Sequence, residues 1–150
     1  MATVRPTVVD EVDTSFLKSL VGYNARRAAL TIIERFLVRM AEFNLRPVDF
    51  SVMSVIHHNP GVTSRQLCNA LNLLPPNLVG LIQALETRAL IHKLPHPKDK
   101  RATGLHATPK GIRLMIEAEE AATKLELENS AKLTPTQLKT LLELLQKIYL

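Results

Sequence analysis

The residues best suited to bind a ligand are cationic and gather in the second half of the chain. Between Arg88 and Arg113 lie seven Lys and Arg residues and one acidic residue, Asp99, so this segment carries a net charge of +6. The whole chain carries only +5. Ammonium and guanidinium groups bind phosphate oxygens, and a basic segment in an otherwise near-neutral protein indicates a polyphosphate partner. The alternative is a solvated charged loop, and the surrounding elements must decide between the two.

The sequence lacks the motifs with which common enzymes bind phosphate or activate a nucleophile. It contains no G-x-S-x-G, no G-x-G-x-x-G and no P-loop, and its five glycines are scattered. The single Cys68 excludes a disulfide framework and is expected to be a small buried thiol. Adjacent His57 and His58 project in different directions on a helix, so the histidines predict no metal site. We therefore expect neither an enzyme nor a bound cofactor.

Long helices must position any binding surface in this chain. Residues 14–44 predict one helix without proline that would span on the order of 45 Å, too long for one small domain to cover. Two apolar stripes imply two packing surfaces, and a partner subunit is the simplest explanation. The stripes are Leu30, Ile33, Leu37 and Met40, and Ile32, Phe36 and Phe43. Pro47 then opens a second helix, which Asn59-Pro60-Gly61 ends.

Two short helices joined by a tight connection follow, which is the pattern of a helix-turn-helix. Thr63 and Gln66 form a capping box at the start of the first helix. Pro75-Pro76 opens the second, which carries a one-sided apolar stripe of Leu78, Leu81, Ile82 and Leu85. Such a helix fits the major groove of DNA.

A change of period after Arg88 predicts a β-hairpin. Residues 91–94 and 105–107 are short mixed segments on either side of a basic tip. A further helix runs from Pro109 to about Asn129, and a second capping box at Thr134 starts the last helix. Because the basic segment falls on the hairpin, which can reach along the DNA backbone toward the minor groove, DNA binding is favoured over a solvated loop.

The predicted fold is mainly α with a small β-hairpin wing. A winged helix-turn-helix of about residues 47–108 is flanked by long dimerisation helices of about 14–44 and 109–150, all within a single domain of residues 1–150. No apolar run approaches the roughly 20 residues of a membrane span, and residues 1–10 contain no signal core. We expect a cytoplasmic protein with no membrane partner.

Three segments resemble the signature of the MarR (multiple antibiotic resistance regulator) family of bacterial transcription factors. Leu85–Ile91, His96–Arg101 and Leu105–Gly111 are similar to the family pattern L-E-x-x-G-L-I, D-x-R and L-x-L-T-x-x-G. Two positions depart from it, Ala89 for glycine and Ala107 for leucine. Ala89 requires either a turn that avoids left-handed geometry or a strained one.

The resemblance implies a homodimer that binds a pseudo-palindromic double-stranded operator and regulates transcription. It further implies a repressor released by a small aromatic or phenolic acid held between the dimerisation and DNA-binding parts. The alternative from another class is a winged-helix protein–protein interaction module whose basic wing binds an acidic partner, because the second helix of the helix-turn-helix carries few hydrogen-bonding side chains.

The candidate DNA-binding residues lie on the wing and on the exposed face of the recognition helix. Arg101 matches the wing-tip arginine of the family and suits a narrow minor groove. Asp99 matches the acid that orients this arginine, or it caps the turn. The remaining candidates are the phosphate-binding Lys98, Lys100 and Arg65, and the recognition-helix residues Pro76, Asn77, Gly80 and Gln83.

The candidate effector-binding residues are chosen by type, with cations for a carboxylate and aromatic groups for a ring. They are Tyr23, Arg26 and Arg27 on the first helix and Phe50 and His57 on the second. Each of these residues is also explained by a place in the core or at a subunit interface.

Overall fold

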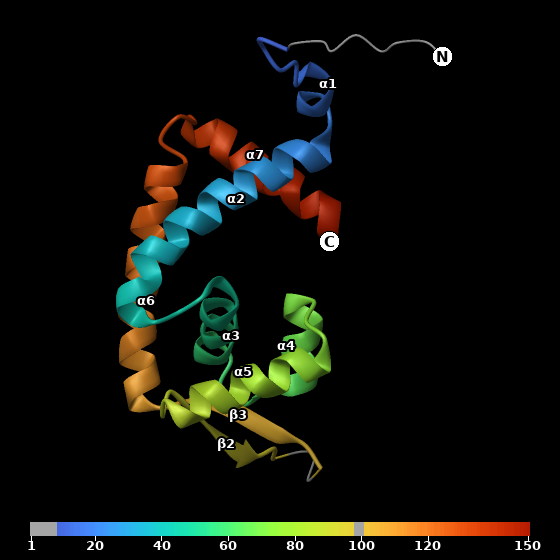
Figure 1. Cartoon of the computed structure of the whole chain (residues 1–150). Helices are drawn as coiled ribbons and strands as arrows, with labels where there is room; N and C mark the ends of the chain where they lie inside the picture. The colour runs from blue at the N-terminus through green and yellow to red at the C-terminus, as the bar shows by residue number, and fades with distance from the viewer. Residues whose placement is uncertain (1–8, 98–100) are drawn as a thin grey trace.

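The computed structural model describes residues 9–97 and 101–150 and divides into a helical arm and a compact winged-helix part (Figure 1). The long helix α6 starts beside the sheet and continues into the arm, so it joins the two parts. The elements, in chain order, are α1 (Ser15–Lys18), α2 (Val21–Met40), the 3-10 helix η1 (Ala41–Phe43), α3 (Pro47–His58), β1 (Val62–Thr63), α4 (Ser64–Leu71), α5 (Pro75–Thr87), β2 (Ile91–Pro95), β3 (Thr103–Ala107), α6 (Pro109–Asn129) and α7 (Pro135–Tyr149).

The first predicted helix is interrupted, which corrects the expectation of one helix over residues 14–44. Leu20 is extended (φ −95°, ψ 129°) and separates α1 from α2. The side-chain amide of Asn24 donates to the carbonyl oxygens of Lys18 and Leu20, at 2.8 Å each. The Ser19 hydroxyl donates to Phe16. These polar side chains satisfy backbone groups locally and so stabilise a break that apolar periodicity does not predict.

The two predicted stripes of α2 are only partly separated in the structure, because Met40 packs with Phe36 and Phe43, whereas Ile32 of that second stripe is 39% exposed. Phe36, Met40 and Phe43 pack on the core of the same chain, and Met40 is fully buried. Leu30, Ile33 and Leu37 remain 43–48% exposed. Met40 is buried because α2 ends where α3 and α6 converge, so its last turn is enclosed on both sides.

One hydrophobic core joins α3, α4, α5, the sheet and the first half of α6. The fully buried side chains that fill it are Met40, Val52, Met53, Ile56, Leu67, Leu78, Leu85, Leu90, Leu105 and Met115. Gly111 allows α6 to approach this core, since a Cβ atom there would lie 2.1 Å from the carbonyl oxygen of Leu90. The fold therefore requires glycine at this position of the motif.

The wing is part of a three-stranded antiparallel sheet rather than the two-stranded hairpin predicted. The strand order is β1-β3-β2, with Val62 opposite Leu105 and His92 opposite His106. The extra strand β1 has only two residues, too few to show an alternating pattern. It joins Gly104 and Leu105 of β3 to the start of α4.

In the parts of the chain that the structure describes, no helix has both the length and the apolar character needed to cross a bilayer.

Ala89 lies in the left-handed region (φ 55°), so the chain adopts the strained turn rather than avoiding it. Left-handed geometry costs an L-residue about 1–2 kcal/mol, which glycine does not lose. We predict that Ala89→Gly raises the free energy of unfolding by about 1 kcal/mol, measured by urea denaturation. Ala84→Gly, in the exposed interior of α5, is the matched control and should lower it by about 0.5–1 kcal/mol. Destabilisation by both substitutions would contradict this account of the turn.

Candidate nucleic-acid interface

The recognition helix α5 and the wing lie at the same end of the molecule, away from α2 and α7 (Figure 1). An ion pair connects them, since Lys93 Nζ on β2 lies 2.7 Å from a carboxylate oxygen of Glu86 on α5. The two elements most suited to DNA grooves are thus held in one orientation within the chain.

Helix α5 has one buried and one exposed face, as its apolar stripe predicts. Leu78, Ile82 and Leu85 are at most 4% exposed. All four predicted contact residues lie on the exposed side, namely Pro76, Asn77, Gly80 and Gln83. A Cβ atom at Gly80 would meet nothing within 4 Å, so packing within the chain does not require glycine there. Asn77 and Gln83 can each pair with an adenine edge.

Helix α4 starts at a capping box. The backbone N–H of Gln66 donates to Thr63 Oγ1, and Oε1 of Gln66 accepts from the backbone N–H of Thr63. This cap places Arg65, which is exposed, in the first turn. Cys68 is half-buried rather than fully buried. It lines a hollow of about 350 Å³ between α4 and α5, together with Ser64, Arg65, Asn69, Pro75, Leu78, Val79 and Ile82.

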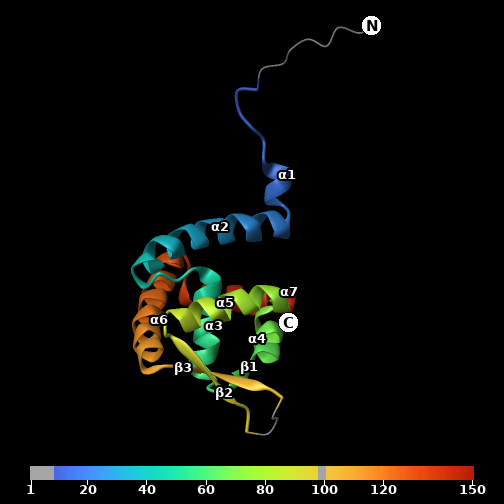
Figure 2. The ribbon, with the colours of Figure 1, turned by 60° about the horizontal axis from the view of Figure 1, so that its bottom comes forward.

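On the wing, Arg101 is exposed just before β3. The predicted residues Lys98, Asp99 and Lys100 lie outside the described residues. Strands β2 and β3 carry His92 and His106 as a stacked cross-strand pair with ring centroids 5.6 Å apart. Arg101 thus lies two residues before the outer end of β3. Figure 2 shows that the ribbon of β2 and β3 extends beyond the body of the protein.

Three cations of the basic segment serve the fold, which sequence counting could not reveal. Lys93 pairs with Glu86, and Lys110 donates to the carbonyl oxygen of Arg88 at 2.9 Å. Arg88 itself points into the protein. The net charge of the segment thus overstates the charge that it presents to a partner.

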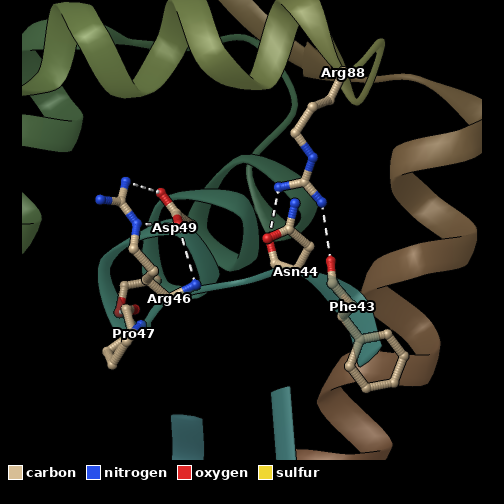
Figure 3. Close-up of polar contacts among 7 residues, drawn as sticks. Phe43, Asn44, Arg46, Pro47, Asp49 and Arg88 are labelled. Atoms are coloured by element: carbon tan, nitrogen blue, oxygen red, sulfur yellow. Dashed lines mark hydrogen bonds and ion pairs between the residues drawn. The ribbon is translucent and has the colours of Figure 1, made fainter. Parts of the chain in front are cut away.

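Arg88 ties the end of the recognition helix to the end of the arm (Figure 3). Its guanidinium donates to the carbonyl oxygens of Asn44, at 2.8 Å, and Phe43, at 2.9 Å. These carbonyls terminate η1, and Asn44 is left-handed (φ 50°). A cation at a helix C-terminus also interacts favourably with the helix dipole. The contact holds the C-terminal end of α5 against the end of the arm.

Asp49 supports the same junction from the first turn of α3. It is 7% exposed, and it accepts hydrogen bonds from the backbone N–H and the guanidinium of Arg46 at 2.8–3.0 Å. Burial alone would raise the pKa of Asp49. The hydrogen bonds from Arg46 and the charges of Arg46 and Arg88 outweigh this effect and hold the pKa below its ordinary value of 3.8.

The candidate effector residues do not come together within one chain. Tyr23 is half-buried and Arg26 and Arg27 are exposed near the start of α2. Phe50 packs edge-on against Phe36 with ring centroids 5.4 Å apart. Phe36 lies about 20 Å along the helix from Tyr23, so these two groups line different regions.

His57, the remaining candidate, lies two turns beyond Phe50 on α3, about 10 Å along the helix. It is half-buried at the end of α3 and stacks edge-on against His58, with ring centroids 4.8 Å apart.

A hollow between α2 and α6 contains cations that the sequence analysis did not select. It has a volume of about 660 Å³ and is lined by Glu34, Arg35, Val38, Arg39, Leu125 and Glu128. Arg39 donates to both carboxylate oxygens of Glu128 at 2.9 Å, and Arg35 donates to Asn129 at 3.0 Å. Their spacing of four residues on one helix was the available signal.

Comparison with known proteins connects this geometry to DNA. A model of the MarR family matches residues 43–102. The structure of the transcriptional repressor CouR bound to a 23-mer DNA duplex is similar, with a TM-score of 0.87 and 33% sequence identity over 93% of this chain and 99% of that one.

Two further comparisons concern the ligand and the role. The structure of the repressor CouR bound to p-coumaroyl-CoA has a TM-score of 0.81 and is 32% identical, over 92% of this chain and 97% of that one. A putative transcriptional regulatory protein for the hcr operon of Thauera aromatica is 27% identical over 129 residues, 85% of this chain and 78% of that protein. The relatives are transcriptional regulators.

The lowered pKa of Asp49 generates a prediction about stability and pH. The folded-state pKa lies below the unfolded value, so ionised Asp49 stabilises the fold fully above that value. The stabilisation is lost as pH falls below 3.8 through the folded pKa. We predict that Asp49→Asn lowers the free energy of unfolding by about 1–3 kcal/mol at pH 7. The difference from wild type should shrink under acid conditions, as measured by urea unfolding at several pH values.

Glu42→Gln is the control, because Glu42 is exposed on the adjacent η1. If the free energy of unfolding of Asp49→Asn stays below that of wild type by the same amount down to acid pH, the carboxylate charge is not the cause of the stabilisation.

Proposed function

The chain belongs to the MarR family of transcriptional regulators, and from this premise we propose that it is a repressor that binds operator DNA as a homodimer and leaves it when an aromatic acyl-CoA thioester binds. The observation that carries the proposal is the likeness to the DNA-bound CouR repressor, which extends over 99% of that chain at 33% identity. The exposed face of α5 and the adjacent wing are the surfaces that such a role requires.

Homodimerisation is supported by apolar surface that a single chain leaves uncovered. Helix α7 is amphipathic and 15 residues long but contains no buried residue. Its exposed apolar side chains include Leu141, Leu142, Leu145 and Ile148, and α2 adds Leu30, Ile33 and Leu37. Extended apolar patches of this kind mark interfaces. We assign dimerisation to residues 14–44 and 109–150 and DNA binding to residues 47–108.

On DNA, the two parts of the interface take different roles. Asn77 and Gln83 read base edges in the major groove, Pro76 offers an apolar surface to thymine methyl groups, and Gly80 permits close approach of the helix backbone. Arg101 enters the minor groove, oriented by Asp99, and Lys98, Lys100 and Arg65 bind phosphates. The alternative role as a protein–protein module is not favoured, because the relative of similar sequence is bound to a DNA duplex. A role on chromosomal DNA places the protein in the bacterial cytoplasm.

The expected effector, a small aromatic acid, is refined by the comparison with CouR bound to p-coumaroyl-CoA. A CoA thioester adds phosphate groups to the phenolic acid and therefore needs exposed cations. Arg26 and Arg27 are exposed on α2, and among the described residues neither forms an ion pair. We assign the phosphates to these arginines and the ring to Tyr23. Because Phe50 and His57 lie elsewhere, completing the site requires surface from the second chain.

Removal of the wing arginine tests the DNA assignment. Arg101→Ala should weaken operator binding by about 1–3 kcal/mol, roughly fivefold to a hundredfold, because a groove contact is lost. The slope of log affinity against log salt should also decrease by about one. Fluorescence anisotropy with a labelled operator over a salt series measures both. Lys132→Ala, at the opposite end of the molecule, is the control and should bind as wild type does. Wild-type affinity in Arg101→Ala would contradict the wing assignment.

Release by a thioester rather than an acid tests the effector. Saturating p-coumaroyl-CoA should weaken operator binding at least about tenfold, the scale of ordinary allosteric coupling. Free p-coumarate and CoA alone should leave binding unchanged, because each has only part of the recognised groups. The double variant Arg26→Ala, Arg27→Ala should bind DNA normally but respond less to the thioester, whereas Lys132→Ala should respond as wild type does. If free p-coumarate releases the operator equally well, the effector is a simple aromatic acid and the thioester assignment is wrong.

A further inference from the structure

Two histidines and a glutamate from different helices converge where α3 meets α6. The ligating atoms of His57, His58 and Glu119 all lie within 4.8 Å of one another. The Nε2 atom of His58 is 2.9 Å and 3.0 Å from the two carboxylate oxygens of Glu119. Among residues 9–97 and 101–150, this is the one group of three side chains able to hold a metal ion.

The type of these ligands fits a transition-metal ion. Two imidazoles and a carboxylate form the protein part of many zinc sites that leave a fourth position open to water or another ligand. With bonds of about 2.0–2.1 Å, neighbouring ligand atoms of a tetrahedral ion are about 3.3 Å apart. Because the present separations do not exceed 4.8 Å, closure requires a shift of at most about 1.5 Å. The His58 side chain is 60% exposed and has room to make it.

The surroundings hold the carboxylate in place. Ser54, one turn before His58 on α3, donates its hydroxyl hydrogen to a carboxylate oxygen of Glu119 at 2.8 Å. Such hydrogen bonds from neighbouring groups orient metal ligands and strengthen binding. The Glu119 side chain is only 27% exposed, so it presents its oxygens from a restricted position.

We propose that His57, His58 and Glu119 form a binding site for a divalent transition-metal ion of the zinc class, with Ser54 positioning Glu119. The site is separate from the DNA-binding face and from the residues assigned to the effector phosphates. It joins the winged-helix part to α6. Three residues after His58 the chain bonds to the wing, since the Gly61 N–H donates to Leu105 on β3 at 2.8 Å. A bound ion therefore restrains α3 against α6 close to the base of the wing.

The test is a titration of the untagged full chain with Zn²⁺ by isothermal calorimetry, supported by the visible absorption of bound Co²⁺. Wild type should bind one ion per chain, with Co²⁺ bands of tetrahedral intensity. His58→Gln and Glu119→Gln should each lower Zn²⁺ affinity more than about tenfold, since loss of a ligand costs at least as much as loss of its supporting hydrogen bond. The metal-free variants should bind operator DNA as wild type does, which checks their folding.

His92→Gln is the matched control, because His92 belongs to the other histidine pair, stacked on His106 in the wing. Its Zn²⁺ affinity should equal that of wild type. The proposal is overturned if His58→Gln or Glu119→Gln retains wild-type affinity, which would leave His58 and Glu119 as a surface ion pair only. Loss of binding in His92→Gln would instead assign the metal to the wing.

Discussion

The orientation of the recognition helix depends on the guanidinium of Arg88. Helix α5 ends at this residue, and its side chain reaches back to two carbonyl oxygens at the end of the arm. Asp49 adds a buried negative charge nearby, which Arg46 and Arg88 keep ionised. Since Lys93 and Glu86 join α5 to the wing, the arm, the helix and the wing form one connected unit.

Much of the fold could be predicted from local sequence. The structure has the predicted capping boxes at Thr63 and Thr134. It also has the predicted prolines at the starts of α3, α5 and α6, and the predicted apolar stripe on α5. The break at Leu20 and the strand β1 were missed, because the polar side chains of Ser19 and Asn24 stabilise the break locally and only two residues form the strand. The MarR-family resemblance and the winged-helix fold were confirmed by the comparisons.

The candidate sites were less accessible to sequence reasoning, because their residues meet only in three dimensions. Charge counting assigned Arg88 to the basic surface, whereas the structure turns its side chain into the junction. Neighbouring residues on a helix are expected to project in different directions, whereas the structure brings the ring centroids of His57 and His58 within 4.8 Å of each other. The third ligand, Glu119, lies 61 positions beyond His58. Tyr23 and Phe50 lie on separate regions of one chain, so a site that includes both needs a second subunit. The metal proposal thus rests on contacts between α3 and α6, and the effector proposal on the likeness to CouR bound to p-coumaroyl-CoA.

The central claim is that two identical chains place two recognition helices and two wings on one duplex. A hydroxyl-radical footprint on the DNA upstream of the protein's own gene tests this most directly. The account predicts two protected segments related by a two-fold axis, with centres about 10–10.5 base pairs apart, one helical turn. A single protected segment, or equal protection of unrelated duplex, would contradict it.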